Sequence, residues 1–182
     1  MPYMLAILLN YMVTLSLFPG IESEIQSCLL GDWMPVILFT TFNLSDLLGK
    51  VEKKEPSLQI IIPSQMLASH SYSWSGARLV MWPLLRIILI PLLILCTLPH
   101  QSSLLQGEFL PLILTTLLGL SNGLFGSLPI ILAPGSVRDG ERELVGNLMT
   151  FSYCCGLTIG SLLAYGLQGV TGYSPQIMLG KC

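Results

Sequence analysis

Five long hydrophobic runs, separated by more polar segments, dominate the pattern along this chain. A hydrocarbon core about 30 Å thick is crossed by roughly 20 mostly apolar residues in a helix, so each run predicts one transmembrane helix. The first two runs are short, and their polar flanks must reach the membrane interface. We therefore expect an all-α polytopic membrane protein with spans at Tyr3–Phe18, Trp33–Gly49, Leu79–Leu98, Phe109–Ala133 and Leu144–Leu167.

The polar segments between the runs predict the domain organisation. After the first run, Pro19 and Gly20 are typical helix-stopping residues, and we expect Glu22 and Glu24 to enter water there. The segment that follows Lys50 mixes charges, prolines and serines with only a short apolar run, which predicts a loop. The resulting division is two spans in 1–50, a cytoplasmic loop in 51–78, three spans in 79–170 and an extracellular or lumenal tail in 171–182.

Composition supports the membrane assignment and excludes one class of partner. Of the 182 residues, 52% are hydrophobic and only 10% charged, whereas an average soluble domain has roughly 25% charged residues. The mean hydropathy is +0.73. A net charge of −2 offers no basic surface to replace the counterions of a nucleic acid. We therefore expect the lipid bilayer to be the partner of the apolar surface of this chain.

The distribution of charge predicts the orientation of the chain in the membrane. Loops on one predicted side carry most of the basic residues, namely Lys50, Lys53, Lys54, Arg78, Arg138 and Arg142. Loops on the other side carry mainly acidic residues. Because cytoplasmic loops are enriched in lysine and arginine, the N-terminus is expected in the cytoplasm and the C-terminus outside the cell or in an organelle lumen.

The second run carries a polar face. Residues three or four apart share one side of a helix, which groups Phe39, Asn43, Asp46 and Lys50, with Phe42 beside them and Gly49 on the flank. Pairing of Asp46 with Lys50 would lower the cost of holding both charges in a low dielectric. Two interpretations stay open at this point: the face lines a route for a polar solute, or the pair lies at the cytoplasmic membrane interface.

Further polar and small residues mark the later runs. Arg86 lies deep enough to need a partner or a path to the interface, and Pro91 predicts a kink beyond it. Small residues spaced by four allow two helices to approach closely. The fourth and fifth runs have such positions, which predicts helix packing through Gly119, Gly123, Gly156 and Gly160, with Asn122 and Ser127 adding polar groups to the fourth.

The residue types needed for catalysis are not grouped in this sequence. The two histidines, His70 and His100, fall in loops on opposite predicted sides of the membrane, so they cannot share a metal site or a catalytic triad. The nucleophile, zinc and phosphate-binding motifs of common enzymes do not occur either. We therefore expect a protein that is not an enzyme and that uses no cofactor and no metal.

Several stretches, in the right order, resemble one membrane protein family. The segment FNLSDLLGK is similar to the F-N-x-x-D-x-x-G-[RK] signature of the equilibrative nucleoside transporter family. RIILIPLLILC, GLSNGLFGSLPIILAPG and ERELVGNLMTFSYCCGLTIGSLLAYG resemble the helices that follow it, and LFPGIESEI resembles the end of the helix before it. The lysine after the glycine and LFPGIESEI look most like the branch that carries organic cations.

The resemblance implies a fold, a function and residue roles. The family fold is similar to that of major facilitator transporters, and this chain would supply the C-terminal half. Facilitative transport of nucleosides or monoamine-like organic cations across the plasma membrane would follow. The substrate site would use Asp46 and Lys50 with support from Asn43, and Arg86 would join a cytoplasmic gate. Further gating or structural positions carried over from the matching motifs are Phe42, Gly49, Asn122, Ser127 and Glu143.

A cavity between two halves cannot be formed by one half. We therefore expect this chain to need an N-terminal half or a full-length transporter as its partner, and not to transport by itself. The alternative interpretation is a non-transporting membrane protein that associates with a full-length transporter and alters its assembly, with the small residues of the fourth and fifth runs as the contact surfaces.

Overall fold

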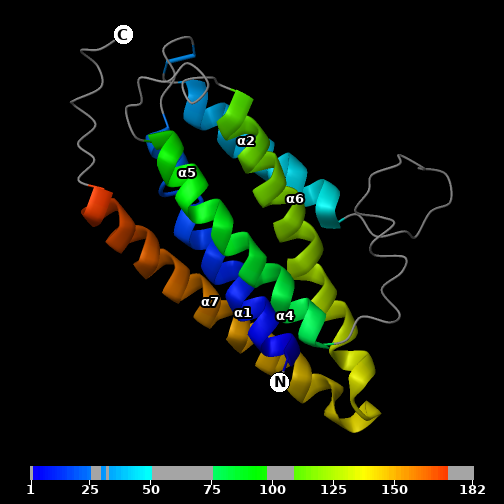
Figure 1. The fold of residues 1–182 in the computed structure, drawn as a ribbon. Coiled ribbons are helices and arrows are strands. Elements are labelled where there is room, and N and C mark those ends of the chain that lie inside the picture. The colour runs from blue at the N-terminus through cyan, green and yellow to red at the C-terminus, as the bar shows by residue number, and fades with distance from the viewer. Residues whose placement is uncertain (1, 26–29, 32, 51–75, 98–108, 172–182) are drawn as a thin grey trace, which may run out of the picture.

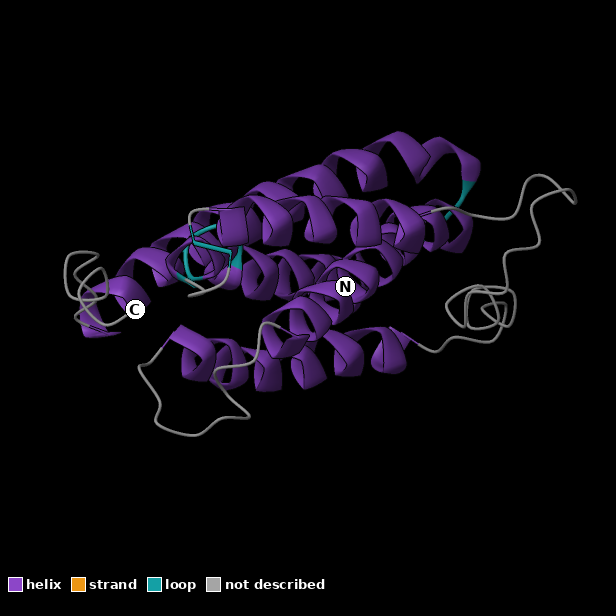
Figure 2. Cartoon of the chain, turned by 90° about the horizontal axis from the view of Figure 1, so that it is seen from above, coloured by secondary structure: helices purple, strands orange, loops and turns teal. Residues whose placement is uncertain are grey.

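The computed structural model describes residues 2–25, 30–31, 33–50, 76–97 and 109–171. The regular elements in this part of the chain are helices (Figures 1 and 2). They are α1 (Pro2–Leu17), α2 (Trp33–Lys50), α4 (Gly76–Leu85), α5 (Leu89–Thr97), α6 (Phe109–Leu132) and α7 (Arg142–Thr171). The predicted loop 51–78 and the predicted tail 171–182 lie almost entirely outside the described residues. Residues 76–78 of the predicted loop are described, and they form the first residues of α4.

Each predicted hydrophobic run corresponds to a helix or, for the third, to two helices joined by a short turn. The all-helical class is therefore confirmed. Three helical stretches are long and apolar enough to cross a membrane, Leu79–Cys96, Phe109–Ser136 and Arg142–Gly169. The first helix, Pro2–Leu17, is apolar but shorter. The five-span architecture and its likeness to half of a major facilitator transporter are consistent with this helix set.

The third run is interrupted at Arg86. A 3-10 turn, η3 (Arg86–Ile88), separates α4 from α5. Pro91 explains an interruption in this region, because it lacks the N–H group that would bond the carbonyl of Ile87 and its ring crowds the preceding turn. The departure from α-helical geometry thus falls before the proline, at the turn that contains the arginine.

The helices pair in two tight contacts. α1 lies along α7, and α2 lies along α6, while α4 and α5 pack against α1 and α6 (Figure 1). Following the colours from blue to red, α1, α4–α5 and α7 run in one direction and α2 and α6 in the other (Figure 1). A buried apolar cluster joins α1, α2, α5 and α6, with Leu17, Leu38, Phe42, Leu93 and Leu118 among its members.

Glycines allow α2 and α6 to approach within backbone contact. A Cβ atom built at Gly123 would lie 2.2 Å from the Asp46 carbonyl oxygen, and one at Gly49 would lie 2.5 Å from the Leu120 carbonyl oxygen. At Gly119 it would lie 2.7 Å from the Phe42 carbonyl oxygen. Only a residue without a side chain fits at such distances, so these positions fix how close the two helices come.

The pair α1 and α7 uses the same device. A Cβ atom at Gly156 would lie 2.7 Å from the Leu8 carbonyl oxygen, and one at Gly160 would lie 2.7 Å from that of Met12. Gly156 and Gly160 are four residues apart and lie on the same face of α7. The small residues of the last helix therefore face α1 rather than the outside of the bundle.

The segment after α1 differs from the prediction made for it. Glu22, expected in water, lies in a short 3-10 helix, η1 (Glu22–Glu24), and is only 2% exposed. The chain folds back after Pro19, so that Glu22 reaches the Thr115 side chain of α6, whose hydroxyl donates to its carboxylate at 3.0 Å. The sequence showed an acid after a helix end, but not that the turn would bury it.

The substitution Gly123→Ala tests the α2–α6 contact. The added methyl group would press on the α2 backbone at Asp46 and Gly49, which cannot move away as a flexible side chain would. We expect a loss of about 1–3 kcal/mol in the free energy of unfolding, the usual cost of overpacking. Unfolding in detergent micelles, followed by far-ultraviolet circular dichroism, measures the change.

The matched control is Gly166→Ala in α7, where a Cβ atom would meet nothing within 4 Å. There we expect no loss, or a gain of up to about 1 kcal/mol, because alanine favours a helix over glycine. Equal stability of the Gly123→Ala variant and the unmodified chain would show that α2 and α6 are not held at this distance.

Candidate functional site

A buried arginine lies at the centre of the polar groups inside the bundle. Arg86 is 5% exposed and sits in η3, where α4 gives way to α5. Its guanidinium donates to the Asn10 side-chain oxygen, to the Thr14 hydroxyl at 2.9 Å and to the Leu118 carbonyl at 3.2 Å. Partners from α1 and α6 thus replace water at the two terminal nitrogens, whereas the buried Nε has no hydrogen-bond partner among the described residues.

Asn122 connects this arginine cluster to α2. Its side-chain oxygen accepts hydrogen bonds from Asn10 Nδ2 at 3.0 Å and from the Thr14 hydroxyl at 2.8 Å. Its amide nitrogen donates to Asp46 Oδ1 at 2.7 Å. Both hydrogen-bonding ends of Asn122 are therefore used, and one amide joins the interior to the polar face of α2.

Asp46 lies between the buried network and the surface of the bundle. One carboxylate oxygen accepts from Asn122, and the other forms an ion pair with the ammonium group of Lys50. The Asp46 side chain is 15% exposed and that of Lys50 44%. Asp46 is thus turned toward α6, whereas Lys50 extends from the bundle.

The remaining residues of the predicted substrate site take different positions. Asn43 is exposed, and its amide donates to the Phe39 carbonyl of its own helix at 2.7 Å. Phe42 is buried, and its ring stacks on that of Phe18 with 3.9 Å between ring centroids. Gly49 lies against α6, as described above. One side of α2 is therefore packed on α6, and the side with Asn43 and Lys50 is open.

Two predicted gating or structural residues lie apart from the network. The Ser127 hydroxyl donates to the Gly123 carbonyl of its own helix, a contact that satisfies the hydroxyl without reaching Asp46. Glu143 is exposed in the first turn of α7. A role for either residue in gating stays a prediction, as does the role of Arg86 in a cytoplasmic gate.

The sequence reasoning missed Asn10 and Thr14. Both are fully enclosed in α1, with 0% and 2% of their surface exposed, and both bind the Arg86 guanidinium. Their spacing of four residues places them on one face of the helix, and that spacing was the signal in the first run. A single asparagine and a single threonine in an apolar run were not enough to indicate a partner in the third run.

The site contains groups for hydrogen bonding and charge pairing but not for metal binding. In the described ranges, His, Cys, Asp and Glu side chains form no group of three that could hold a metal ion. The hydrogen-bonded network combines cationic, amide, hydroxyl and carboxylate groups in one place. Its members are Arg86, Asn10, Thr14, Asn122, Asp46 and Lys50. Such a set can bind a polar solute through several hydrogen bonds at its open end.

We predict that Arg86→Met destabilises the bundle. The substitution keeps an unbranched side chain but removes the donors that bind Asn10, Thr14 and Leu118. We expect a loss of about 2–3 kcal/mol, the scale of hydrogen bonds to a charged group. Chemical unfolding in micelles measures it, with the exposed Arg138→Met as the control. Greater stability of Arg86→Met than of the unmodified chain would mean that desolvation of the guanidinium outweighs its bonds.

Comparison with known proteins places this sequence in a family. A family model described as nucleoside transporter matches residues 1–168. Equilibrative nucleoside transporter 4 of Homo sapiens is 44% identical over 168 residues, which cover 92% of this chain and 29% of that protein. The protein of the same name from Danio rerio is 41% identical over 169 residues, covering 93% of this chain and 30% of the relative.

A more distant relative shows the same pattern. Equilibrative nucleoside transporter 1 of Rattus norvegicus is 29% identical over 179 residues, covering 91% of this chain and 36% of the relative. The chain therefore spans about a third of the length of these curated relatives. The family resemblance inferred from FNLSDLLGK and the motifs around it is confirmed, because the family model extends over nearly the whole sequence. This chain is an integral membrane protein that belongs to the nucleoside transporter family.

Proposed function

We propose that residues 1–182 form the C-terminal part of a facilitative carrier for nucleosides or monoamine-like organic cations. The observation that carries the proposal is the position of Asp46, which is bonded on one side to the buried Asn122 and on the other to Lys50 at the open side of α2. A solute that meets this face finds charges and dipoles already oriented by the bundle. Preorganised groups bind without paying for their own ordering.

The proposed route runs along the open side of α2. Phe39, Asn43 and Lys50 are all exposed there, while the neighbouring side of the helix packs on α6 through Gly49. In a bilayer, charged side chains lie in the bundle interior or along a water-filled cavity. We infer that a second group of helices, from an N-terminal half or from a full-length transporter, faces Asn43 and Lys50 and closes the route.

The charge balance bears on the choice of solute. Asp46 and Lys50 form a pair without net charge, so this site by itself favours neutral solutes with several hydrogen-bonding groups. Nucleosides fit this description, and the relatives carry nucleoside transporter in their names. Selective uptake of cations would require a further acid close to the route, from this chain or from its partner.

The proposed setting is the plasma membrane, with the N-terminus in the cytoplasm. The support for this orientation is the concentration of lysine and arginine in the loops predicted on the cytoplasmic side. In that arrangement Lys50 lies near the cytoplasmic end of α2, and η1 with Glu22 lies toward the outside. Transport then needs no cofactor, because the solute gradient and the membrane potential supply the free energy.

We predict that residues 1–182 reconstituted alone in proteoliposomes take up neither radiolabelled adenosine nor a radiolabelled monoamine above the level of empty vesicles. The reason is that, among the described residues, the side of α2 with Asn43 and Lys50 is left exposed and is not closed by another helix. Co-reconstitution with the N-terminal part of the human relative, which is 44% identical in the matching region, should create uptake. Comparison of the two labels then identifies the preferred solute class.

Uptake by residues 1–182 alone would contradict the proposed need for a second half. Stable association with a complete transporter, without any uptake in the complemented vesicles, would instead favour the alternative of a non-transporting interaction protein. Retention of the reconstituted protein in the vesicles, measured by immunoblot, shows that a negative result is not a loss of protein.

We predict that Asp46→Asn lowers uptake by the complemented carrier about 10- to 100-fold. The substitution preserves the shape of the side chain but removes the charge that holds Lys50, and a hydrogen bond to a charged group contributes about 1.5–3 kcal/mol. Initial rates of uptake measure the effect. Glu141→Gln, at an exposed acid before α7, is the control and should leave the rate unchanged. An unaltered rate in Asp46→Asn would remove this residue from the substrate site.

A further inference from the structure

The hydrogen bonds between Arg86 and Asp46 run in one direction. A guanidinium group can only donate hydrogen bonds, and a carboxylate paired with a cation can only accept them. Two amides, Asn10 of α1 and Asn122 of α6, lie between these ends. Each amide has an oxygen that accepts and a nitrogen that donates. The groups at the two ends therefore determine which way each amide is turned.

The order of donors and acceptors is kept at every step. Asn10 Oδ1 accepts from Arg86, which leaves Asn10 Nδ2 to donate to Asn122 Oδ1 at 3.0 Å. Asn122 then offers its nitrogen to Asp46 Oδ1 at 2.7 Å. We call Arg86, Asn10, Asn122 and Asp46 the amide relay. Thr14 adds a second branch, because its hydroxyl accepts from Arg86 at 2.9 Å and lies 2.8 Å from Asn122 Oδ1.

Burial makes this order hard to reverse. Asn10 is 0% exposed and Asn122 4%, so neither side chain is open to the surface of the bundle. A Cβ atom at Gly126 would lie 3.1 Å from Asn10 Nδ2, so the α6 backbone closely surrounds the Asn10 amide. A turned amide would set oxygen against oxygen, and a buried polar group without its bond is costly.

We propose that Asn10 and Asn122 are positioning residues that transmit to Asp46 the orientation imposed by Arg86. The relay holds one carboxylate oxygen of Asp46 against α6, and the other oxygen is then presented to Lys50 on the open side of α2. The consequence for uptake rests on the proposed function. The relay itself does not, and it can be measured in a protein that transports nothing.

Asn10→Asp reverses the relay while it keeps the acceptor for Arg86. A carboxylate oxygen then replaces Nδ2 and faces Asn122 Oδ1. Turning the Asn122 amide removes that conflict, but it brings the amide oxygen against the Asp46 carboxylate. Adding Asp46→Asn supplies a donor at this last step. The double variant therefore restores an ordered relay, and its net charge equals that of the unmodified chain.

The test is a double-mutant cycle on unfolding in detergent micelles. We expect Asp46→Asn to destabilise the unmodified chain but to stabilise Asn10→Asp, so that its two effects on the folding equilibrium constant differ at least tenfold. With Asn122→Leu, which keeps the approximate shape but removes the amide, the difference should shrink to about twofold or less. Equal effects in both backgrounds, or a tenfold difference that persists without the amide, would overturn the relay.

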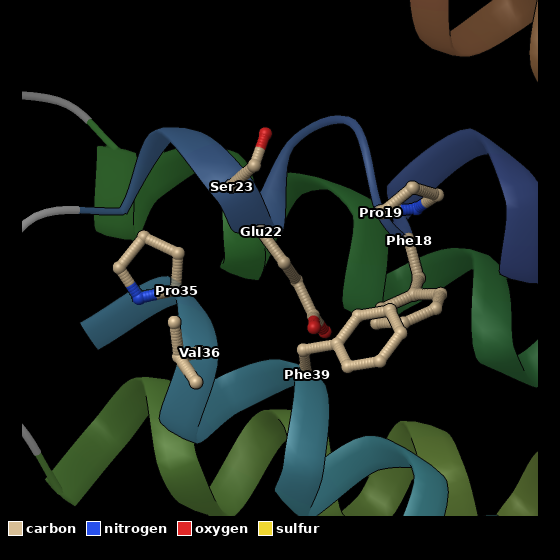
Figure 3. Close-up of a pocket in the computed structure, with 7 residues that line it drawn as sticks. All are labelled: Phe18, Pro19, Glu22, Ser23, Pro35, Val36 and Phe39. Atoms are coloured by element: carbon tan, nitrogen blue, oxygen red, sulfur yellow. The ribbon is translucent and has the colours of Figure 1, made fainter. Parts of the chain in front are cut away.

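Glu22 provides the control for this cycle, because it is a buried acid outside the relay. It lines a cavity of about 280 Å³ between the turn after α1 and the first half of α2, where it points toward the rings of Phe18 and Phe39 (Figure 3). Its hydrogen bond comes from Thr115 and not from a relay residue. Glu22→Gln should therefore change stability equally, within about twofold, in the unmodified chain and in Asn10→Asp.

Uptake by the complemented carrier tests the consequence for transport. Asn10→Asp should lower the initial rate about tenfold, the usual effect of losing a hydrogen bond to a charged group, while circular dichroism shows that the variant is folded. Asn147→Asp, the same change at an exposed position of α7, should leave the rate unchanged. An unchanged rate in Asn10→Asp would overturn the positioning role. If the unmodified carrier takes up no solute, the proposed function fails, and the unfolding cycle still decides on the relay.

Discussion

The arrangement of this bundle depends on the need to solvate one cation, the guanidinium of Arg86, away from water. A charge in a hydrocarbon environment is tolerated only with protein partners. Here α1 supplies Asn10 and Thr14, and α6 supplies the Leu118 carbonyl. These bonds fix the rotation of two helices relative to the break at η3. Apolar side chains alone would not specify it, since between lipid-facing helices they give little directional preference.

Close helix packing is what allows the same network to reach α2. Gly49 and Gly123 let the backbones of α2 and α6 touch, and at that separation Asn122 bonds Asp46 at 2.7 Å. A larger residue at Gly123 would push away the very backbone that carries Asp46. The small residues and the polar residues of this region therefore act together: the former set the distance over which the latter interact. This coupling is the physical reason why a glycine and a charged pair, Asp46 with Lys50, work together within five residues of α2.

Most of the fold followed from the pattern of apolar residues, because a chain in lipid must satisfy its backbone within helices. The predicted run at Phe109–Ala133 became α6, Phe109–Leu132, and that at Trp33–Gly49 became α2, Trp33–Lys50. The contacts between helices could not be predicted from the pattern of apolar residues. A local pattern marks Asn10, Thr14 and Glu22 as polar, but whether a polar residue meets water or a partner depends on helices far away in the sequence. Asp46 and Arg86 stand out in the sequence because charges within apolar runs are costly, whereas the neutral Asn10 and Thr14 give a weaker signal.

The two acids near the open side of the bundle show how environment separates their chemistry. Asp46 has a cation and an amide as partners, so its charge is compensated within the protein. Glu22 has one neutral donor and apolar walls, so its charge is disfavoured until something else compensates it. A nearby cation favours the ionised form of a carboxyl group, whereas burial without a cation favours the neutral form. A single helix, α2, borders both groups: Asp46 belongs to it, and its first half lines the cavity beside Glu22, so two carboxylates of opposite character lie along one helix.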